Sequence, residues 1–225
     1  MEINSMSMMS FFNPMQKAVD GIVNAAKPRL LTYEAEGSDD EKSRFYTGHP
    51  HVPSDSSGVT LGHGYDLSQR TPDEVKNDLS QIGMSRDKIA LYVQAADAKK
   101  TGDNARRFIA EKKLGADTLT LPQRGTLFNI IYEKMEKDAG RFYSSWVSIN
   151  PAIRAIIVDL RFRGDLTADS RRLIQDSVQN NNLKGLLETM SKKSNWPKVP
   201  PDRVTRRIDF LQDQVGMSAK LNFKA

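Results

Sequence analysis

The residues best suited to chemistry in this chain lie in two short segments, Glu36-Gly37 and Ser57 to Leu67. The second segment reads Ser-Gly-Val-Thr-Leu-Gly-His-Gly-Tyr-Asp-Leu and places Thr60 and Asp66 in a β-forming run that glycines interrupt. Glycines in a strand contribute no packing side chain and often mark a sharp turn or a closely approaching ligand. A carboxylic acid that protonates a leaving oxygen and a carboxylate that activates water can together hydrolyse a glycosidic bond. We therefore interpret Glu36 as a candidate general acid, Asp66 as the base and Thr60 as the hydroxyl that positions the water.

The composition describes a globular chain of 225 residues, with 38% hydrophobic residues, 27% charged residues and a net charge of +5. No apolar run approaches the ~20 residues that span a bilayer, and the absence of cysteine excludes disulfides, thiolate metal sites and cysteine nucleophiles. A basic excess favours anionic partners such as an acidic cell-wall polymer. The basic pairs are dispersed and lack interleaved aromatic residues, so we expect no nucleic-acid partner.

Residues 1–28 are interpreted as a helical appendage to a domain that covers residues 29–225. Asn13-Pro14 suits an N-cap followed by proline at the first helical position, and an amphipathic helix is expected from there to about Lys27. No Lys or Arg precedes the apolar part of the first fifteen residues, so a cleaved secretory signal is not expected.

The elements that must position the candidate residues are a short helix, a small antiparallel sheet and a helical bundle. The helix is expected to end at Gly37, and strands are expected near 43–47 and 58–65. Two segments, Thr71-Pro72-Asp73-Glu74 and Thr120-Leu121-Pro122-Gln123, have the pattern of a capping box. Further helices are expected near 85–97, 103–114, 168–180 and 183–193, after Pro151, and from about 201 to 215. The pattern predicts an α+β domain in which a sheet lobe and a helical lobe enclose a cleft.

The residues around the glycine-rich segment resemble a known family. Glu36-Gly37, an expected strand pair and the segment from Ser57 to Leu67 are similar to the pesticin-like and phage-type muramidases with the T4-lysozyme fold. The resemblance implies that Glu36 is the acid and that Thr60 and Asp66 complete the site. It also implies an inverting enzyme without a cofactor, which cleaves the β-1,4 bond between N-acetylmuramic acid and N-acetylglucosamine in peptidoglycan. Pro201-Asp202-Arg203 resembles a Pro-Asn-Arg stretch of that fold, which implies that Arg203 pairs with Glu36.

Several residues admit a second interpretation. Asp55 is the alternative base, because it precedes Thr60 at a spacing close to the Asp–Thr order of T4 lysozyme. Asp66 could instead cap the loop that follows it, and Thr60 could be an ordinary strand residue. His63 and Tyr65 are expected to support the site from the cleft.

Two other functions remain open at this point. His49, His51 and His63 could bind zinc together with an aspartate, as in a metal-dependent amidase or peptidase of the cell wall, but their spacing is not that of a helical zinc motif. The other function that remains open is that of a catalytically inactive module that binds the cell wall. With peptidoglycan as the partner and no signal peptide, we expect a phage endolysin or a secreted effector that is made in the cytoplasm and acts in the periplasm or cell wall. An effector would have a cognate immunity protein and a secretion or delivery component as further partners.

Overall fold

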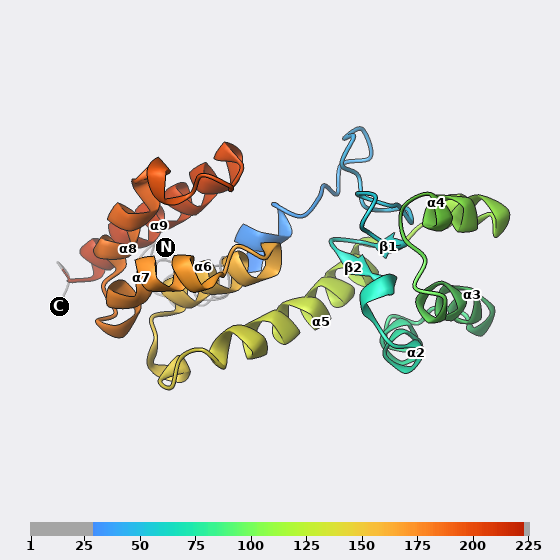
Figure 1. The fold of residues 1–225 in the computed structure, drawn as a ribbon, viewed down its shortest axis with the longest axis horizontal. Helices are drawn as coiled ribbons and strands as arrows, with labels where there is room; N and C mark the ends of the chain where they lie inside the picture. Colours follow the sequence, from blue (N-terminus) through green and yellow to red (C-terminus); the bar gives the residue numbers. More distant parts are fainter. Residues whose placement is uncertain (1–28, 223–225) are drawn as a thin grey trace, which may run out of the picture. The chain divides into compact units, whose positions relative to one another are not determined.

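The computed structural model describes residues 29–222, which divide into two compact units: residues 33–143, and residues 144–222 with 29–32 (Figure 1). The described chain is mostly helical and contains a small two-stranded antiparallel sheet. The expected α+β class is therefore confirmed at this level. The helix expected at 13–27 lies outside the described residues.

The sheet in residues 33–143 is a short hairpin. Strands β1 (Thr60–Leu61) and β2 (Tyr65–Asp66) are antiparallel, with Thr60 opposite Asp66 and Leu61 opposite Tyr65. The prediction of one strand near 58–65 is wrong, because the chain reverses at Gly62 and Gly64, whose φ angles are 54° and 92°. Side chains on L-residues disfavour these left-handed values, so glycine at both positions permits the turn.

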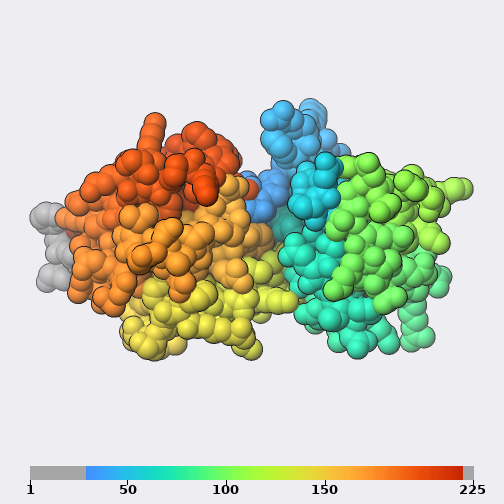
Figure 2. Space-filling view, viewed as in Figure 1, coloured from blue at the N-terminus to red at the C-terminus, as the bar shows by residue number. Residues whose placement is uncertain are grey.

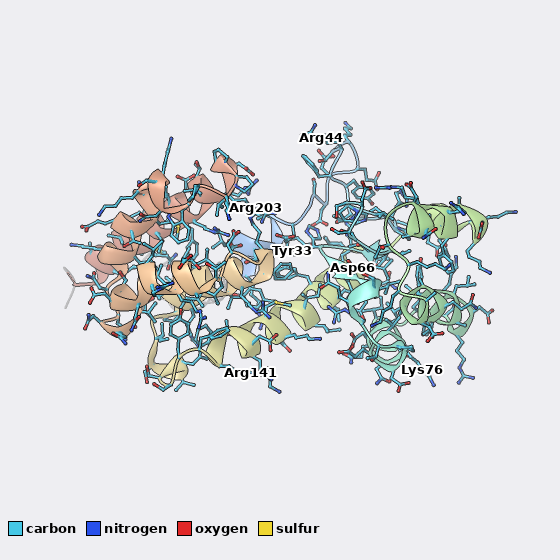
Figure 3. The ribbon with its side chains drawn as sticks, in the orientation of Figure 1. Tyr33, Arg44, Asp66, Lys76, Arg141 and Arg203 are labelled. Atoms are coloured by element: carbon cyan, nitrogen blue, oxygen red, sulfur yellow. The ribbon has the colours of Figure 1, made fainter. Side chains whose placement is uncertain are left out.

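The strand predicted near 43–47 is also wrong. These residues form turns, and Tyr46 makes one isolated bridge, to Ser38. The amide of Tyr46 donates to the carbonyl of Ser43, and the amide of Phe45 donates to the Ser43 hydroxyl. Polar side chains that bond the nearby backbone favour turns over strands. The loop projects from its unit (blue in Figure 2), and Phe45 is exposed beneath the guanidinium of Arg44 (labelled in Figure 3).

Four helices complete this unit: α2 (Pro72–Gln81), α3 (Arg86–Asp97), α4 (Gly102–Glu111) and α5 (Leu121–Gly140), with 3-10 turns η1 (Leu67–Gln69) and η2 (Leu114–Ala116). Both predicted capping boxes are confirmed, at the starts of α2 and α5. Helix α2 packs against α3 and α5, and α5 also contacts β2. The hairpin therefore shares a unit with helices that the sequence had assigned to a separate helical lobe. The reason is that its apolar face, with Leu61 and Tyr65 fully buried, needs those helices as its cover.

In the second unit, the regular elements of residues 144–222 are all helices, which loops and turns connect. It contains α6 (Pro151–Arg163), α7 (Ala168–Gln179), α8 (Leu183–Ser191), α9 (Pro201–Asn222) and 3-10 turns η3 (Trp146–Ser148) and η4 (Lys193–Asn195). The predicted apolar stripe of α6 is confirmed, since its four members are fully buried: Ile153, Ile156, Ile157 and Leu160. The buried Arg207 joins α9 to α6, with its Nε 2.7 Å from Asp159. Between residues 29 and 222, every helix is too short or too polar to be a membrane span.

Candidate active site

Glu36 lies in a turn after a helix. The helix that contains residues 29–33 ends at Tyr33, whereas the sequence predicted an end at Gly37. The amide of Glu36 donates to the carbonyl oxygen of Tyr33 over 3.2 Å, which closes the turn. The Glu36 residue is half-buried. A general acid must come within hydrogen-bond reach of the oxygen that it protonates, and the partial exposure of Glu36 is compatible with that role.

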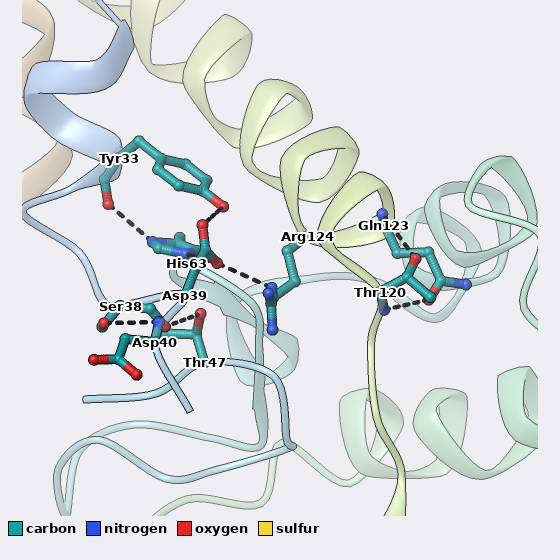
Figure 4. Close-up of polar contacts among 9 residues, drawn as sticks. All are labelled: Tyr33, Ser38, Asp39, Asp40, Thr47, His63, Thr120, Gln123 and Arg124. Carbon is teal, nitrogen blue, oxygen red and sulfur yellow. Dashed lines mark hydrogen bonds and ion pairs between the residues drawn. The ribbon is translucent and has the colours of Figure 1, made fainter. Parts of the chain in front are cut away.

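His63 contacts both ends of the turn that carries Glu36 (Figure 4). Its Nδ1 lies 2.8 Å from the carbonyl oxygen of Tyr33, and its Nε2 lies 3.1 Å from Oδ1 of Asp39. The imidazole is 1% exposed and stacks on the Tyr33 ring, with 3.7 Å between the ring centroids. Because both partners are acceptors, the ring completes both hydrogen bonds when each nitrogen carries a proton. His63 thus joins the hairpin turn to the segment that bears Glu36.

Asp39 is the centre of this network. Its Oδ2 accepts a hydrogen bond of 2.8 Å from the Tyr33 hydroxyl, and Nε of Arg124 lies 3.1 Å from its Oδ1. Burial would raise the pKa of Asp39, but the hydrogen bonds from His63 and Tyr33 and the charges of His63 and Arg124 together lower it below its usual value. Burial, followed by the bond to Asp39, raises the pKa of Tyr33. The carboxylate therefore remains charged and orders the turn.

The sequence did not identify Asp39 or Arg124 as parts of the site. Asp39 precedes another aspartate, Asp40, which is exposed. No local pattern distinguishes these two aspartates. Arg124 lies in the first turns of α5, directly after the capping box, and is 5% exposed. A basic residue at such a position normally faces solvent, so its burial was not predictable.

Thr60 and Asp66 lie side by side across the hairpin, and Gly58 connects them. The Thr60 hydroxyl donates to the Gly58 carbonyl over 3.1 Å, and the Gly58 amide donates to Oδ1 and Oδ2 of Asp66 over 3.1 and 3.2 Å. A Cβ atom on Gly58 would lie 2.6 Å from Oδ1 of Asp66. The close approach therefore requires glycine. The hairpin brings together two of the three residues that the sequence assigned to catalysis.

Asp66 also caps the turn that follows it. Its Oδ1 accepts from the Ser68 amide at 2.9 Å and from the Ser68 hydroxyl at 2.7 Å, and its Oδ2 accepts from Gln69 Nε2 at 3.3 Å. These bonds make Asp66 the N-cap of η1, which confirms the capping interpretation of this residue. Oδ2 has the longer contacts, so it is the oxygen better able to accept a further partner.

The remaining predicted site residues have other surroundings. The Asp55 side chain is 92% exposed and accepts a hydrogen bond from Arg106 over 2.9 Å. Tyr65 is fully buried and donates its hydroxyl to Asp78 of α2 over 2.6 Å, so it packs in the core of its unit. Arg203 lies in the first turn of α9 in the other unit, and its pairing with Glu36 stays a prediction.

Two of the histidines considered as zinc ligands, His49 and His51, contact backbone carbonyl oxygens. Nδ1 of His49 lies 2.8 Å from the carbonyl oxygen of Asp117, and Nδ1 of His51 lies 3.0 Å from the carbonyl oxygen of His49. Burial lowers the pKa of His51. In the part of the chain that the structure describes, no three His, Asp or Glu side chains are grouped in a way that could hold a metal ion.

Comparison with known proteins places the chain in a family. No curated protein matches it. A family model described as "Domain of unknown function (DUF8812)" matches residues 29–208, which is well over half of the 225 residues. The chain belongs to the DUF8812 family.

Proposed function

We propose that this protein is a lysozyme-like glycoside hydrolase of peptidoglycan, which cleaves the β-1,4 bond between N-acetylmuramic acid and N-acetylglucosamine. The observation that carries the proposal is the hairpin that pairs Thr60 with Asp66, while its turn residue His63 bonds the segment that bears Glu36. Three chemically suitable groups thus come from one hairpin and the turn bonded to it. The resemblance of the same residues to the muramidase pattern supports the assignment of roles.

In the proposed mechanism, Glu36 donates its proton to the glycosidic oxygen as the bond to the leaving sugar breaks. Asp66 accepts a proton from a water that attacks the anomeric carbon from the opposite face, which inverts the configuration. The water approaches Oδ2 of Asp66, where the bond from Gln69 is the longest of the contacts to this carboxylate at 3.3 Å. Thr60 donates its own proton to Gly58, so its oxygen lone pairs are oriented to accept from that water.

His63, Asp39 and Arg124 act as positioning residues in this proposal. They hold the turn at Glu36 through the Tyr33 carbonyl and through the Asp39 carboxylate. Catalytic groups require support of this kind, because small displacements of an acid from its leaving atom cost large factors in rate. Arg203 is proposed as a further partner of Glu36.

The test uses the purified full chain and isolated peptidoglycan sacculi. Glu36→Gln removes the acidic proton while keeping the side-chain volume, and we expect the lysis rate to fall by roughly 10²–10⁴-fold. Glu34→Gln is the matched control, because this glutamate is exposed and lies two residues earlier. Mass spectrometry of the products distinguishes new reducing sugars from the new amines released by an amidase or peptidase. A folded Glu36→Gln variant that lyses sacculi at the wild-type rate would rule out the proposal.

A non-catalytic wall-binding module is the second candidate function. The occupied oxygens of Asp66 favour it, since a carboxylate that caps a turn can be purely structural. This candidate predicts that the wild-type chain sediments with sacculi and releases no muropeptides. It also predicts that Glu36→Gln binds as well as the wild type.

The proposed substrate also implies where the protein acts. It would be made in the cytoplasm and would reach the wall as a phage endolysin or as a secreted effector. An effector would have a cognate immunity protein. A pull-down from producing cells, followed by inhibition of lysis with the captured protein, tests for that partner.

A further inference from the structure

A pocket of about 290 Å³ opens in the hairpin-containing unit, between η1, the start of α2 and the end of α3. Its lining includes Ser68, Gln69, Arg70, Asp97 and Lys99. Ligand pockets commonly occupy ~300–1,000 Å³. This one lies at the lower limit of that range, so it suits a small charged group and is too small for a chain of sugars.

Arg70 gives the pocket its chemical character. The residue is 8% exposed, and its guanidinium carbon lies 4.2 Å from the centroid of the Tyr65 ring. Its Nε is buried without a hydrogen-bond partner, and no described carboxylate lies within ion-pair distance of its guanidinium. A buried cation without an anion is unfavourable, and a ring face compensates only part of the lost hydration. The guanidinium therefore has unused capacity for an anionic partner.

The charged side chains that line the pocket carry a net positive charge. Lys99 contributes a second cation at the rim, from a left-handed residue with φ of 42°. Thr71 and Pro72 also line the pocket at the N-terminus of α2, where the Glu74 carboxylate already accepts from the Thr71 amide at 2.8 Å. Asp97, which is exposed, places one negative charge in the lining. The two cations exceed this single anion among the lining side chains.

We propose that this pocket binds a carboxylate of the peptidoglycan stem peptide, with Arg70 as its main contact and Lys99 as its second. The pocket adjoins the candidate active site, because Ser68 and Gln69 both line the pocket and donate to the carboxylate of Asp66. A glycan strand held at Asp66 would thus bring its acidic peptide branch to Arg70. Guanidinium binds carboxylate through two parallel hydrogen bonds, which favours a carboxylate over a neutral amide. This inference rests on the proposed function for its choice of ligand.

The test measures binding without hydrolysis. The probe is the tripeptide L-Ala-γ-D-Glu-L-Lys, which contains no sugar, and the reference is the same peptide with its carboxylates amidated. In amide NMR spectra of the full chain, we expect the acidic peptide to shift residues 68–71 and 97–99. We expect the amidated peptide to leave these signals unchanged.

Two variants assign the binding to Arg70. Arg70→Met keeps the volume of the side chain and removes its charge, and it should weaken binding of the acidic peptide at least tenfold. Arg44→Met is the matched control, since Arg44 also lies over an aromatic ring but is exposed on the projecting loop. Thermal melts of both variants verify folding. Equal binding to wild type and Arg70→Met would overturn the proposal, as would the absence of any shift in the wild type.

Inorganic phosphate separates a stem-peptide subsite from a general anion site. If phosphate shifts the same residues and binds as tightly as the peptide, the assignment to the stem peptide is wrong. The result also separates this inference from the proposed function. Peptide binding by a chain that releases no reducing sugars would refute the muramidase, whereas lysis without peptide binding would refute the pocket.

Discussion

The His63 ring stacks on the Tyr33 ring at 3.7 Å, and its Nδ1 lies 2.8 Å from the carbonyl oxygen of the same residue. That carbonyl also accepts from the amide of Glu36. One backbone oxygen therefore joins the turn of the hairpin to the turn of the candidate acid. The fold and the proposed chemistry depend on the same contact, which makes it a suitable target for mutation.

Replacing His63 should lower stability more than replacing any surface histidine. His63→Ala would remove one hydrogen bond from the Tyr33 carbonyl and one from the Asp39 carboxylate, together with the stacked ring. Each lost hydrogen bond contributes about 0.5–1.5 kcal/mol, and the lost packing adds to this. Urea denaturation should show the loss, whereas the exposed His49→Ala should change stability by less than about 1 kcal/mol. Similar midpoints for the two variants would show that the contact contributes little.

Asp39 should give the protein an acid-sensitive component of stability. Its pKa is lowered in the folded state, so the unfolded chain binds the proton more tightly. The stabilisation is therefore fully present above the unfolded pKa of about 4 and is lost as pH falls through the lower folded value. Asp39→Asn should flatten the stability curve below about pH 4, whereas Asp40→Asn, at an exposed residue, should not. Parallel curves for wild type and Asp39→Asn would contradict the prediction.

His51 should make the stability of the protein depend on pH in a higher range than Asp39 does. Burial lowers its pKa, so the folded state favours the neutral ring. As pH falls through about 6.5, the unfolded chain gains a proton that the folded chain does not, and stability decreases until the folded pKa is reached. His51→Gln should remove this decrease. Denaturation midpoints measured between pH 7.5 and 5 test it, and an unchanged slope in the variant would count against it.

A methyl group at Gly58 should disrupt the pairing of Thr60 and Asp66. The added Cβ would lie 2.6 Å from Oδ1 of Asp66 and 2.7 Å from Cβ of Ser68. Such overpacking costs about 1–3 kcal/mol, and the displaced carboxylate should also slow lysis. Gly125→Ala in α5 is the control, because a Cβ there meets no atom within 4 Å. That variant should be stabilised by about 0.5–1 kcal/mol. Chemical denaturation and lysis rates of both variants give the comparison.

The two candidate bases can be separated by paired substitutions. Asp66→Asn should reduce lysis by roughly 10²-fold or more, since a neutral amide cannot accept the proton of the water. Asp55→Asn should leave the rate unchanged, because that side chain is exposed and contacts Arg106. Thermal melts must accompany the first variant, as Asp66 also caps η1. A large loss in Asp55→Asn alone would reverse the assignment.

The sequence by itself determined the elements that depend on neighbouring residues. Thr71 with Glu74 and Thr120 with Gln123 specified two helix starts, because each capping box is closed by side chains three residues apart. The apolar stripe of α6 likewise specified the buried face of that helix, because its members recur every three or four residues. Thr60 and Asp66 were also singled out together, as polar residues of a glycine-interrupted segment that resembles the muramidase pattern, although their pairing across a hairpin was not predicted.

Only the tertiary structure decided which polar residues became buried and what they contact. Arg124 reaches Asp39 from α5, and His63 reaches it from the turn between β1 and β2. No local sequence pattern distinguishes Asp39, which joins the network, from the exposed Asp40. The hairpin also depends on distant parts of its unit, since β2 contacts α5 and the Tyr65 hydroxyl donates to Asp78 of α2. Capping and periodicity are encoded within one helical turn, whereas burial of a charge depends on partners that folding brings together from distant parts of the chain.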